Sequence, residues 1–399
     1  EFFEPTSLMT AATFLLLPCC SYAAATTDWM LVANDFSRWM MDNDVRYVNP
    51  TERNARYELW NGRQKKVISH NAGNSSWEAS VNSFSDRSAA ELKSRNGYIG
   101  SIGSIGDKKK ERVDSIDWRM HGIVNKIKNQ EQCGSCWAFS AIASLEGQYA
   151  LHHNLTSFSE QDLVDCVKNV DSRVGPCCDG CEGGLMSAAF DYIMGNQKGG
   201  DDLETNYPYL ALDGSCSWSG DGPSLSKIIR QINLPLGSQS ALEEAVSTVG
   251  PISVGVDAND DWQMYSDGVY IPDPDNGGCS SDPADLDHGV AVVGYNTDTF
   301  DVGHANKTLS YWIIRNSWGT DWGIDGYMYL SKDAHNACGV ANYATYPVVA
   351  TSDGLSEENQ CLNSHSQCPQ EVCYTSCPCA CFLASNSSPC DCSAATCTC

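Results

Sequence analysis

The stretch with the clearest chemical meaning is the run QEQCGSCW, which begins at Gln130 and places a cysteine at Cys136. From Ala138 to Tyr149 the apolar residues recur at steps of three and four, which predicts a helix that begins close to Cys136. A thiolate at the start of a helix faces the positive end of the helix dipole, and this lowers its pKa. The pattern therefore predicts a cysteine nucleophile.

A nucleophilic cysteine also needs a base and a group that orients the base. His288 stands just before the strand-like run AVVGY, and Asn316 follows the strand-like run WIIR. The side-chain carbonyl of Asn316 could accept the imidazole N–H and hold its tautomer. A lone buried cysteine is usually structural, but one that follows Gly-Ser, opens a helix and has both partners is better explained as catalytic.

Cysteines and charges divide the 399-residue chain into parts. Of the 21 cysteines, ten lie in 361–399, whereas 26–112 contains none. Segment 26–112 has 14 basic and 11 acidic residues, and segment 113–350 has 11 and 32. The first segment should therefore be attracted to the second near neutral pH, and less so as carboxylates are protonated. The net charge of −25 excludes a basic nucleic-acid-binding face, so we expect no nucleic-acid partner.

The N-terminal part predicts a signal peptide at 9–25. An apolar stretch, Ala11 to Leu17, precedes the small residues Ala23 to Ala25. It is shorter than the roughly 20 apolar residues that cross a bilayer, so we expect no transmembrane segment; the alternative is a buried core helix. We expect the secretory pathway, with a lysosomal, vacuolar or extracellular destination. Four N-x-S/T glycosylation sequons agree with this: Asn74, Asn154, Asn306 and Asn386.

The cysteine-free segment reads as helical and then extended. A stripe at steps of four and three predicts one helix face, with Glu52 and Arg56 able to pair. Its members are Glu52, Arg56, Trp60, Arg63, Val67 and Asn71. Asn82, Phe84 and Asp86 follow with period two, as in a short extended segment. The Gly- and Ser-rich stretch 96–106 and the basic run 108–112 predict a cleavage linker.

Together these motifs resemble the papain-like cysteine proteases, nearest to cathepsin L, over about 36–347. The resemblance also rests on Asp287-His288, on NSWGTDWG from Asn316 and on CEGG from Cys181. The propeptide motif of the cathepsin L type is matched by Glu52, Arg56, Trp60, Val67, Asn71, Asn82, Phe84 and Asp86. His288 and Asn316 lie 152 and 180 residues after Cys136, slightly more than usual, and two acidic surface loops at 272–285 and 296–307 explain the excess.

The resemblance implies an α+β, papain-like two-lobe fold, with a helical lobe and a β-barrel-like lobe. A helical propeptide and a small disulfide-rich tail complete the chain. The boundaries that follow are a signal peptide at 9–25, an inhibitory propeptide at 26–112, a peptidase domain at 113–350, a linker at 351–360 and a Cys-rich module at 361–399.

The resemblance also assigns roles. Cys136 is the nucleophile, paired as a thiolate with the His288 imidazolium, and Asn316 orients His288. Gln130 and the Cys136 N–H stabilise the oxyanion. Gly183 and Gly184 present backbone groups to the substrate, and Trp318 shields the His–Asn hydrogen bond. The further substrate-binding residues are Leu185, Met186, Gly255, Leu286, Asp287 and Tyr343. With Tyr343 as its floor, the pocket for the second residue upstream of the cleaved bond should favour Leu or Val over large aromatic residues.

The cysteines outside the nucleophile are divided by the same resemblance. It implies three bridges, Cys133–Cys181, Cys166–Cys216 and Cys279–Cys338, and it leaves Cys177 and Cys178. Those two could form a vicinal bridge, stay free or pair elsewhere. The tail has too little apolar content for a core of its own, so it is either a small disulfide knot or a thiolate metal cluster.

The expected function is that of a cysteine endopeptidase made as a zymogen, with an apolar preference two residues upstream of the cleaved bond. The propeptide is removed near Lys110–Asp114 at acidic pH. We expect a monomer that acts on protein and peptide substrates, is inhibited by its own propeptide, and uses no cofactor and no metal in its active site. The alternative is a latent or non-proteolytic binding protein that acts through the Cys-rich tail.

Overall fold

The computed structural model describes residues 35–98, 113–172, 175–198, 200–220, 227–273 and 277–350, without the side chains of 171, 172, 175 and 176. The predicted signal peptide, linker, Cys-rich module and Asn386 lie outside the described residues, as does most of the predicted cleavage linker. Within the described ranges no helix is both long and apolar enough to span a bilayer. The sequon residues Asn74, Asn154 and Asn306 are exposed.

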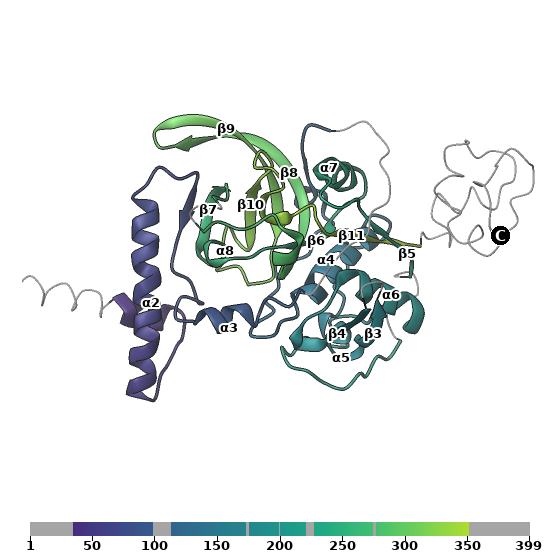
Figure 1. Ribbon diagram of the computed structural model, residues 1–399. Helices are drawn as coiled ribbons and strands as arrows, with labels where there is room; N and C mark the ends of the chain where they lie inside the picture. The colour runs from purple at the N-terminus through teal and green to yellow at the C-terminus, as the bar shows by residue number, and fades with distance from the viewer. Residues whose placement is uncertain are drawn as a thin grey trace, which may run out of the picture.

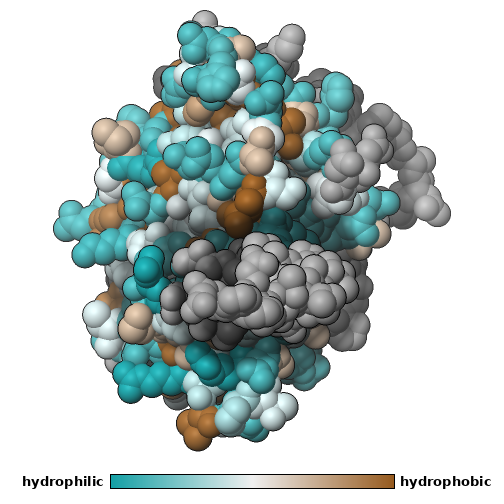
Figure 2. Space-filling view, turned by 90° about the vertical axis from the view of Figure 1, so that its left-hand side faces the viewer, coloured by the Kyte–Doolittle hydropathy of each residue, from teal (hydrophilic) through white to brown (hydrophobic). Residues whose placement is uncertain are grey.

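The propeptide is built around α2 (Pro50–Asn71), which stands at one side of the molecule (Figure 1). The helix begins where the side chain of Asn49 accepts a hydrogen bond from the Thr51 N–H, with Pro50 in the first turn. Its buried residues are Trp60 and Val67. Trp60 packs against an aromatic pair from the helical segment 35–42, Phe36 and Trp39. The outer face on this side is largely hydrophilic (Figure 2), because the apolar stripe is turned inward.

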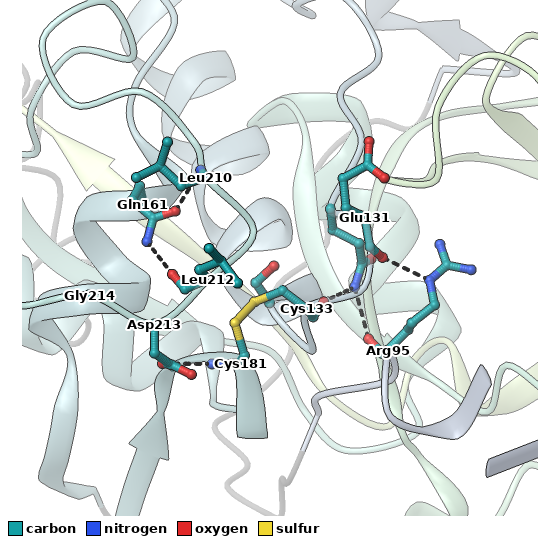
Figure 3. Close-up of a disulfide and its surroundings, with 12 residues drawn as sticks. Arg95, Glu131, Cys133, Gln161, Cys181, Leu210, Leu212, Asp213 and Gly214 are labelled. Carbon is teal, nitrogen blue, oxygen red and sulfur yellow. Dashed lines mark hydrogen bonds between the residues drawn. A yellow bond between two sulfur atoms is a disulfide. The ribbon is translucent and has the colours of Figure 1, made fainter. Parts of the chain in front are cut away.

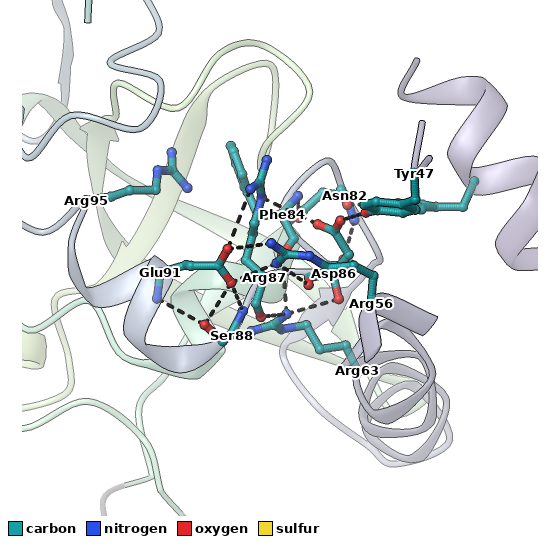
Figure 4. Close-up of polar contacts among 12 residues, drawn as sticks. Tyr47, Arg56, Arg63, Asn82, Phe84, Asp86, Arg87, Ser88, Glu91 and Arg95 are labelled. Carbon is teal, nitrogen blue, oxygen red and sulfur yellow. Dashed lines mark hydrogen bonds and ion pairs between the residues drawn. The ribbon is translucent and has the colours of Figure 1, made fainter. Parts of the chain in front are cut away.

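Polar members of the stripe contact the short helix α3 (Ala89–Lys93) and the segment before it. Arg56 forms a two-pronged ion pair with Glu91, at 2.7 and 2.8 Å (Figure 4). Glu91 also closes a capping box with Ser88 at the start of α3. The spacing allows Glu52 to pair with Arg56, but Glu91 is the main partner of this guanidinium. Glu52 is exposed in the first turn and adds only a weaker attraction.

Two further stripe residues hold the extended part of the propeptide. Arg63 donates hydrogen bonds to the main-chain carbonyls of Phe84, Ser85 and Arg87 (Figure 4). Asn71 accepts from the Ala79 N–H and donates to its carbonyl, which fixes β1 (Trp77–Ala79) beside α2. The stripe thus holds three later segments of the predicted propeptide: β1, residues 84–87 and α3.

The helical lobe is centred on α4 (Cys136–Ala150), in which every residue before Ala150 is buried. A helix that is apolar all round must be covered on all sides. It packs against α5 (Glu160–Cys166), α6 (Met186–Asn196) and the strands of the other lobe. A hairpin of β3 (Lys168–Ser172) and β4 (Gly175–Asp179) follows α5.

The second lobe is a curved sheet, above the helical lobe in Figure 1. In the part of the chain that is described, the sheet has nine strands, in the order β1-β7-β10-β9-β8-β6-β11-β5, with β2 paired to β8. The strand bounds are β2 (Ile116–Asp117), β5 (Ile228–Asn233), β6 (Ile252–Val256), β7 (Tyr265–Tyr270), β8 (His288–Val302), β9 (Ala305–Arg315), β10 (Tyr327–Ser331) and β11 (Ala344–Val349). Two helices lie on this lobe, α7 (Gln239–Thr248) and α8 (Asp260–Met264).

One predicted surface loop is instead regular structure. Residues 296–302 continue β8, and 305–307 open β9, so the expected loop at 296–307 is a hairpin extension. Its register is continuous from Asn296 opposite Tyr311 to Val302 opposite Ala305. The acidic residues that suggested a loop are exposed on this hairpin, where water solvates them.

The three bridges implied by the resemblance are present: Cys133–Cys181, Cys166–Cys216 and Cys279–Cys338. Cys177 and Cys178 form the vicinal bridge, which was one of three open possibilities. Of the cysteines that the structure describes, Cys136 alone is free.

A cluster of buried carboxyl groups lies in the helical lobe. Asp162 accepts from Gln197 Nε2 at 2.7 Å and from the Asp202 N–H at 3.2 Å, and Asp201 accepts from the Ser159 N–H at 3.0 Å. The carboxyl groups of Asp162 and Asp201 also act on each other, which favours a proton on Asp201. Burial raises the pKa of Asp162 to about 6 and that of Asp201 well above its ordinary value.

Candidate active site

Cys136 is the first residue of α4 and is completely buried. The preceding Ser135 does not cap the helix, because its hydroxyl hydrogen-bonds with that of Tyr209 at 2.6 Å. The sulfur accepts hydrogen bonds from the main-chain N–H groups of Gly97, at 3.2 Å, and Gly289, at 3.3 Å. The geometry places a single free thiol at the positive end of the central helix.

The close approach of β8 to α4 places the backbone of Gly289, the residue after His288, against this thiol. A Cβ atom added to Gly289 would lie 3.2 Å from the Cys136 carbonyl oxygen and 3.2 Å from the Cα of Trp137. A side chain at this position would therefore force the strand away from the helix. His288 precedes this glycine as the first residue of β8, so the two lobes meet at the predicted catalytic pair.

Asn316 holds the imidazole of His288. His288 Nε2 and Asn316 Oδ1 are 2.8 Å apart. The same oxygen accepts the Ser317 N–H at 2.8 Å, which identifies it as the oxygen rather than the nitrogen of the amide. Nε2 must then carry the proton, and Nδ1, which is buried without a hydrogen-bond partner, is left as the basic nitrogen.

Trp318 covers the hydrogen bond between His288 and Asn316. Its ring centroid is 4.7 Å from that of His288, and only 2% of the side chain is exposed. Water is thereby kept from this hydrogen bond, as the resemblance implies.

Gln130 is fixed by three hydrogen bonds. Its Oε1 accepts from the Ser317 hydroxyl at 2.8 Å, and its Nε2 donates to the Cys133 carbonyl at 2.9 Å. Nε2 also donates to the Arg95 carbonyl of the propeptide at 2.8 Å (Figure 3). The carbonyl oxygen of Arg95 therefore occupies a position in which the Gln130 amide donates to it and can polarise it.

The chain crosses this site at 95–98, and the last three of these residues open the stretch 96–106 that was predicted to be part of a cleavage linker. The Gly97 carbonyl accepts from the Gly184 N–H at 2.7 Å, and the Tyr98 N–H donates to the Asp287 carbonyl at 3.0 Å. A Cβ added to Gly97 would meet the Gly134 carbonyl oxygen at 1.7 Å, so only glycine allows this close passage. Gly183 makes its own hydrogen bonds within the enzyme, to Gly180 and from Asp179.

The side chain of Tyr98 fills the pocket expected for the second upstream residue. Its ring lies 5.3 Å from that of Tyr343, and a Cβ on Gly255 would be 3.0 Å from it. Tyr98 shares a buried cluster with the other lining residues, Leu185, Met186 and Leu286. The pocket with Tyr343 as its predicted floor therefore has room for the ring of Tyr98, and the predicted preference of substrates for Leu or Val stays a prediction. The Tyr98 hydroxyl is buried without a partner.

Burial beneath the propeptide keeps the catalytic pair uncharged. Burial raises the pKa of the Cys136 thiol and lowers that of the His288 imidazole, so both side chains are neutral beneath the propeptide. Burial also raises the pKa of Asp287 to about 6, although its carboxylate accepts from Asn96 Nδ2 and the Ala258 N–H. The predicted thiolate–imidazolium pair thus requires a site open to water.

Sequence reasoning missed several residues here. Ser317 and Tyr209 each position Gln130 by a hydrogen bond from a distant part of the chain. The Ser317 hydroxyl donates to Gln130 Oε1, and the Tyr209 hydroxyl donates to the Gln130 carbonyl at 2.8 Å. Arg95 and Tyr98 stand in a stretch of Gly, Ser and Asn with no periodicity, and the lone aromatic residue was the one available signal. In the described ranges no three His, Cys, Asp or Glu side chains come together in a way that would hold a metal ion.

Comparison with known families gives two matches. The model described as papain family cysteine protease matches residues 113–348, and the cathepsin propeptide inhibitor domain (I29) matches residues 36–92.

Similar proteins cover most of the chain. Procathepsin L of Rattus norvegicus is 39% identical over 353 residues, which are 86% of this chain and 100% of that protein. Cathepsin L of Sarcophaga peregrina is 34% identical over 84% of this chain and 98% of its own length. Among solved structures, digestive procathepsin L 3 of the Tenebrio molitor larval midgut has a TM-score of 0.67 at 34% identity and covers 79% of this chain and 99% of its own.

Proposed function

Because the chain belongs to the papain family of cysteine proteases and is a cathepsin L-like zymogen, we propose that it cleaves peptide bonds as an endopeptidase through Cys136 and His288. One observation carries the proposal. The free thiol that opens α4 lies against the strand that begins with His288, whose Nε2 is held by Asn316. Nucleophile, base and orienting group thus form one connected arrangement.

The reaction begins when the propeptide leaves and water enters the site. The proton of the Cys136 thiol passes to His288 Nδ1, and the helix dipole stabilises the thiolate. The sulfur attacks the substrate carbonyl carbon, and the C–N bond breaks as the imidazolium gives its proton to the leaving amine. Water, deprotonated by His288, then attacks the thioester, which releases the acid and restores the thiol.

The oxyanion formed at each attack is stabilised by two donors. These are Gln130 Nε2 and the Cys136 N–H. The support for Gln130 is its fixed amide, which already donates to the Arg95 carbonyl of the propeptide. One such donor contributes about 3–4 kcal/mol to transition-state stabilisation.

The propeptide inhibits by occupying these same groups. It is assigned to 26–112 and the peptidase domain to 113–350, with cleavage near Lys110–Asp114 at acidic pH. We propose that the enzyme travels through the secretory pathway to a lysosomal, vacuolar or extracellular destination. It acts there as a monomer on protein and peptide substrates.

The pocket filled by Tyr98 gives the substrate preference. An apolar residue two positions upstream of the cleaved bond, including Phe, fits a lining of Leu185, Met186, Leu286 and the Tyr343 ring. Tyr should bind less well than Phe, because the structure offers its hydroxyl no partner.

Acid activation followed by labelling with a thiol-directed epoxide tests the function. We expect one label per processed chain, located at Cys136 by mass spectrometry, together with loss of peptidase activity. Cys136→Ala is the matched control and should be neither labelled nor active. A processed wild-type chain that is unlabelled at Cys136 and cleaves no peptide would overturn the proposal.

A further inference from the structure

Arg95 of the propeptide is a buried cation held by aromatic rings. Its guanidinium carbon lies 3.8 Å from the ring centroid of Phe84 and 5.0 Å from that of Trp318, and 1% of the residue is exposed. Nε donates to the Glu131 carbonyl at 3.0 Å (Figure 3), whereas the two terminal nitrogens have no partner. Burial lowers the Arg95 pKa to about 9, so the side chain remains charged at neutral pH.

The enzyme's half of this cation site remains after the propeptide leaves. Phe84 and Arg95 belong to the propeptide, but Trp318 and Glu131 belong to the peptidase domain. Glu131 adopts a left-handed backbone conformation with φ of 54°, which is uncommon for a residue other than glycine. Asn129 holds it there by accepting the Glu131 N–H and donating to its carboxylate, both at 3.0 Å.

The charge of Glu131 acts on the cation as well. Its carboxylate is exposed, and it is the strongest of the charged groups that favour the protonated form of Arg95. Glu131 thus places a main-chain carbonyl and a negative charge beside the face of the Trp318 indole ring that Arg95 covers. Both features attract a guanidinium or ammonium group.

The position of Arg95 identifies the side of the cleaved bond. Tyr98 occupies the pocket upstream of the bond, and the Gly97 N–H lies on the Cys136 sulfur. Arg95 lies beyond the sulfur, on the downstream side.

We propose that Glu131 and the face of Trp318 form a subsite that selects Arg or Lys within the first two positions downstream of the cleaved bond. This inference rests on the proposed peptidase function of the same site. The propeptide uses the subsite for inhibition, and a substrate uses it for recognition. Because the carboxylate is exposed, we expect Arg to be preferred over Gln only about three- to fivefold. This preference should decrease as the salt concentration rises.

The test uses the acid-activated enzyme and internally quenched peptides that differ at one position. One set carries Arg, Gln or Glu at the first downstream position, and a second set carries them at the second. The measured quantity is the ratio of kcat/KM for the Arg peptide to that for the Gln peptide. A ratio within one enzyme is independent of the amount of active enzyme, so a partly misfolded variant still gives an answer.

For the wild type we expect a ratio of about three to five at one of the two positions, falling towards one in high NaCl. Glu131→Gln should bring the ratio close to one, and Glu131→Lys should favour the Glu peptide. Glu182→Gln, an equal charge change on the upstream side, should keep the wild-type ratio. A wild-type ratio of one at both positions, or an unchanged ratio in Glu131→Gln, overturns the subsite while cleavage of the Gln peptides still supports the peptidase. Cleavage of no peptide overturns both.

Discussion

The side-chain amide of Gln130 donates to the main-chain carbonyl of Arg95 at 2.8 Å. The donor assigned to the reaction's oxyanion is therefore engaged by the inhibitory segment. A neutral carbonyl binds there less strongly than an oxyanion, because hydrogen bonds to charged acceptors are stronger. The same amide can thus contribute modestly to inhibition and strongly to catalysis.

Replacing Gln130 should affect turnover more than zymogen stability. We expect Gln130→Ala to lower kcat/KM about 10²- to 10³-fold, with kcat carrying most of the loss. Gln130→Glu removes the donor at nearly constant shape and should be similarly impaired. Gln132→Ala, at an exposed neighbouring position, is the control. Active-site titration with the epoxide keeps the comparison per intact Cys136, and near-normal kcat in both variants would contradict the oxyanion role.

Changes at Tyr98 should alter how readily the zymogen activates. Tyr98→Phe keeps the ring but removes a buried hydroxyl without a partner, so it should strengthen inhibition by about 1–2 kcal/mol and slow processing. Tyr98→Ala empties the pocket and should speed processing. Gel analysis of time courses at mildly acidic pH measures both, with Tyr57→Phe on α2 as the control. Faster processing of Tyr98→Phe would show that the hydroxyl stabilises the inhibited form.

The ion pair of Arg56 with Glu91 should set part of the pH range of inhibition. The pair lowers the pKa of Glu91 from 4.5 to about 2, so its contribution is present above 4.5 and is lost as pH falls towards 2. Glu91→Gln should therefore be processed at a higher pH than the wild type. Glu58→Gln, exposed on α2, should behave as the wild type. Identical pH profiles for the wild type and Glu91→Gln would show that this ion pair does not stabilise the inhibited form.

The carboxyl pair of Asp162 and Asp201 should make the helical lobe more stable in acid. The folded-state pKa of Asp201 is raised, so its contribution is present below 3.8 and is lost as pH rises through the folded value. Asp201→Asn is neutral at every pH, so the folded lobe no longer has to keep a buried carboxyl group protonated. We expect a higher Tm than the wild type at neutral pH, by about 3 °C per kcal/mol, and little difference in acid. Asp325→Asn, which is exposed, is the control, and an equal Tm at neutral pH would contradict the pairing.

The two-lobe papain-like fold could be predicted from the sequence because its signals are local. The solved relatives confirm it. Gly-Ser before Cys136 and the apolar runs beside His288 and Asn316 each determine one short element. The contacts that join those elements, such as Ser317 to Gln130, depend on the packing of both lobes and leave no pattern in the chain.

Other features had no periodic signal. Most residues of the hairpin at 296–307 are exposed and only Val302 is buried, so the apolar and polar alternation that identifies a half-buried strand is too short to recognise. Two carboxylates, those of Glu52 and Glu91, were possible partners of Arg56. Glu91 is distant in the sequence but is the main partner, because the fold places α3 opposite the guanidinium. The path of 95–98 across the active site could not be predicted because it depends on close packing. Only glycine fits at position 97, where the chain lies against Gly134.

The propeptide also completes the sheet of the enzyme, because β1 pairs with β7 at one end of it. Once the propeptide is removed, β7 becomes a terminal strand whose main-chain groups between Tyr265 and Gly268 have lost their partner. Such an edge is a template on which another extended chain can add. The propeptide strand therefore covers a sheet edge that the mature enzyme would expose along β7.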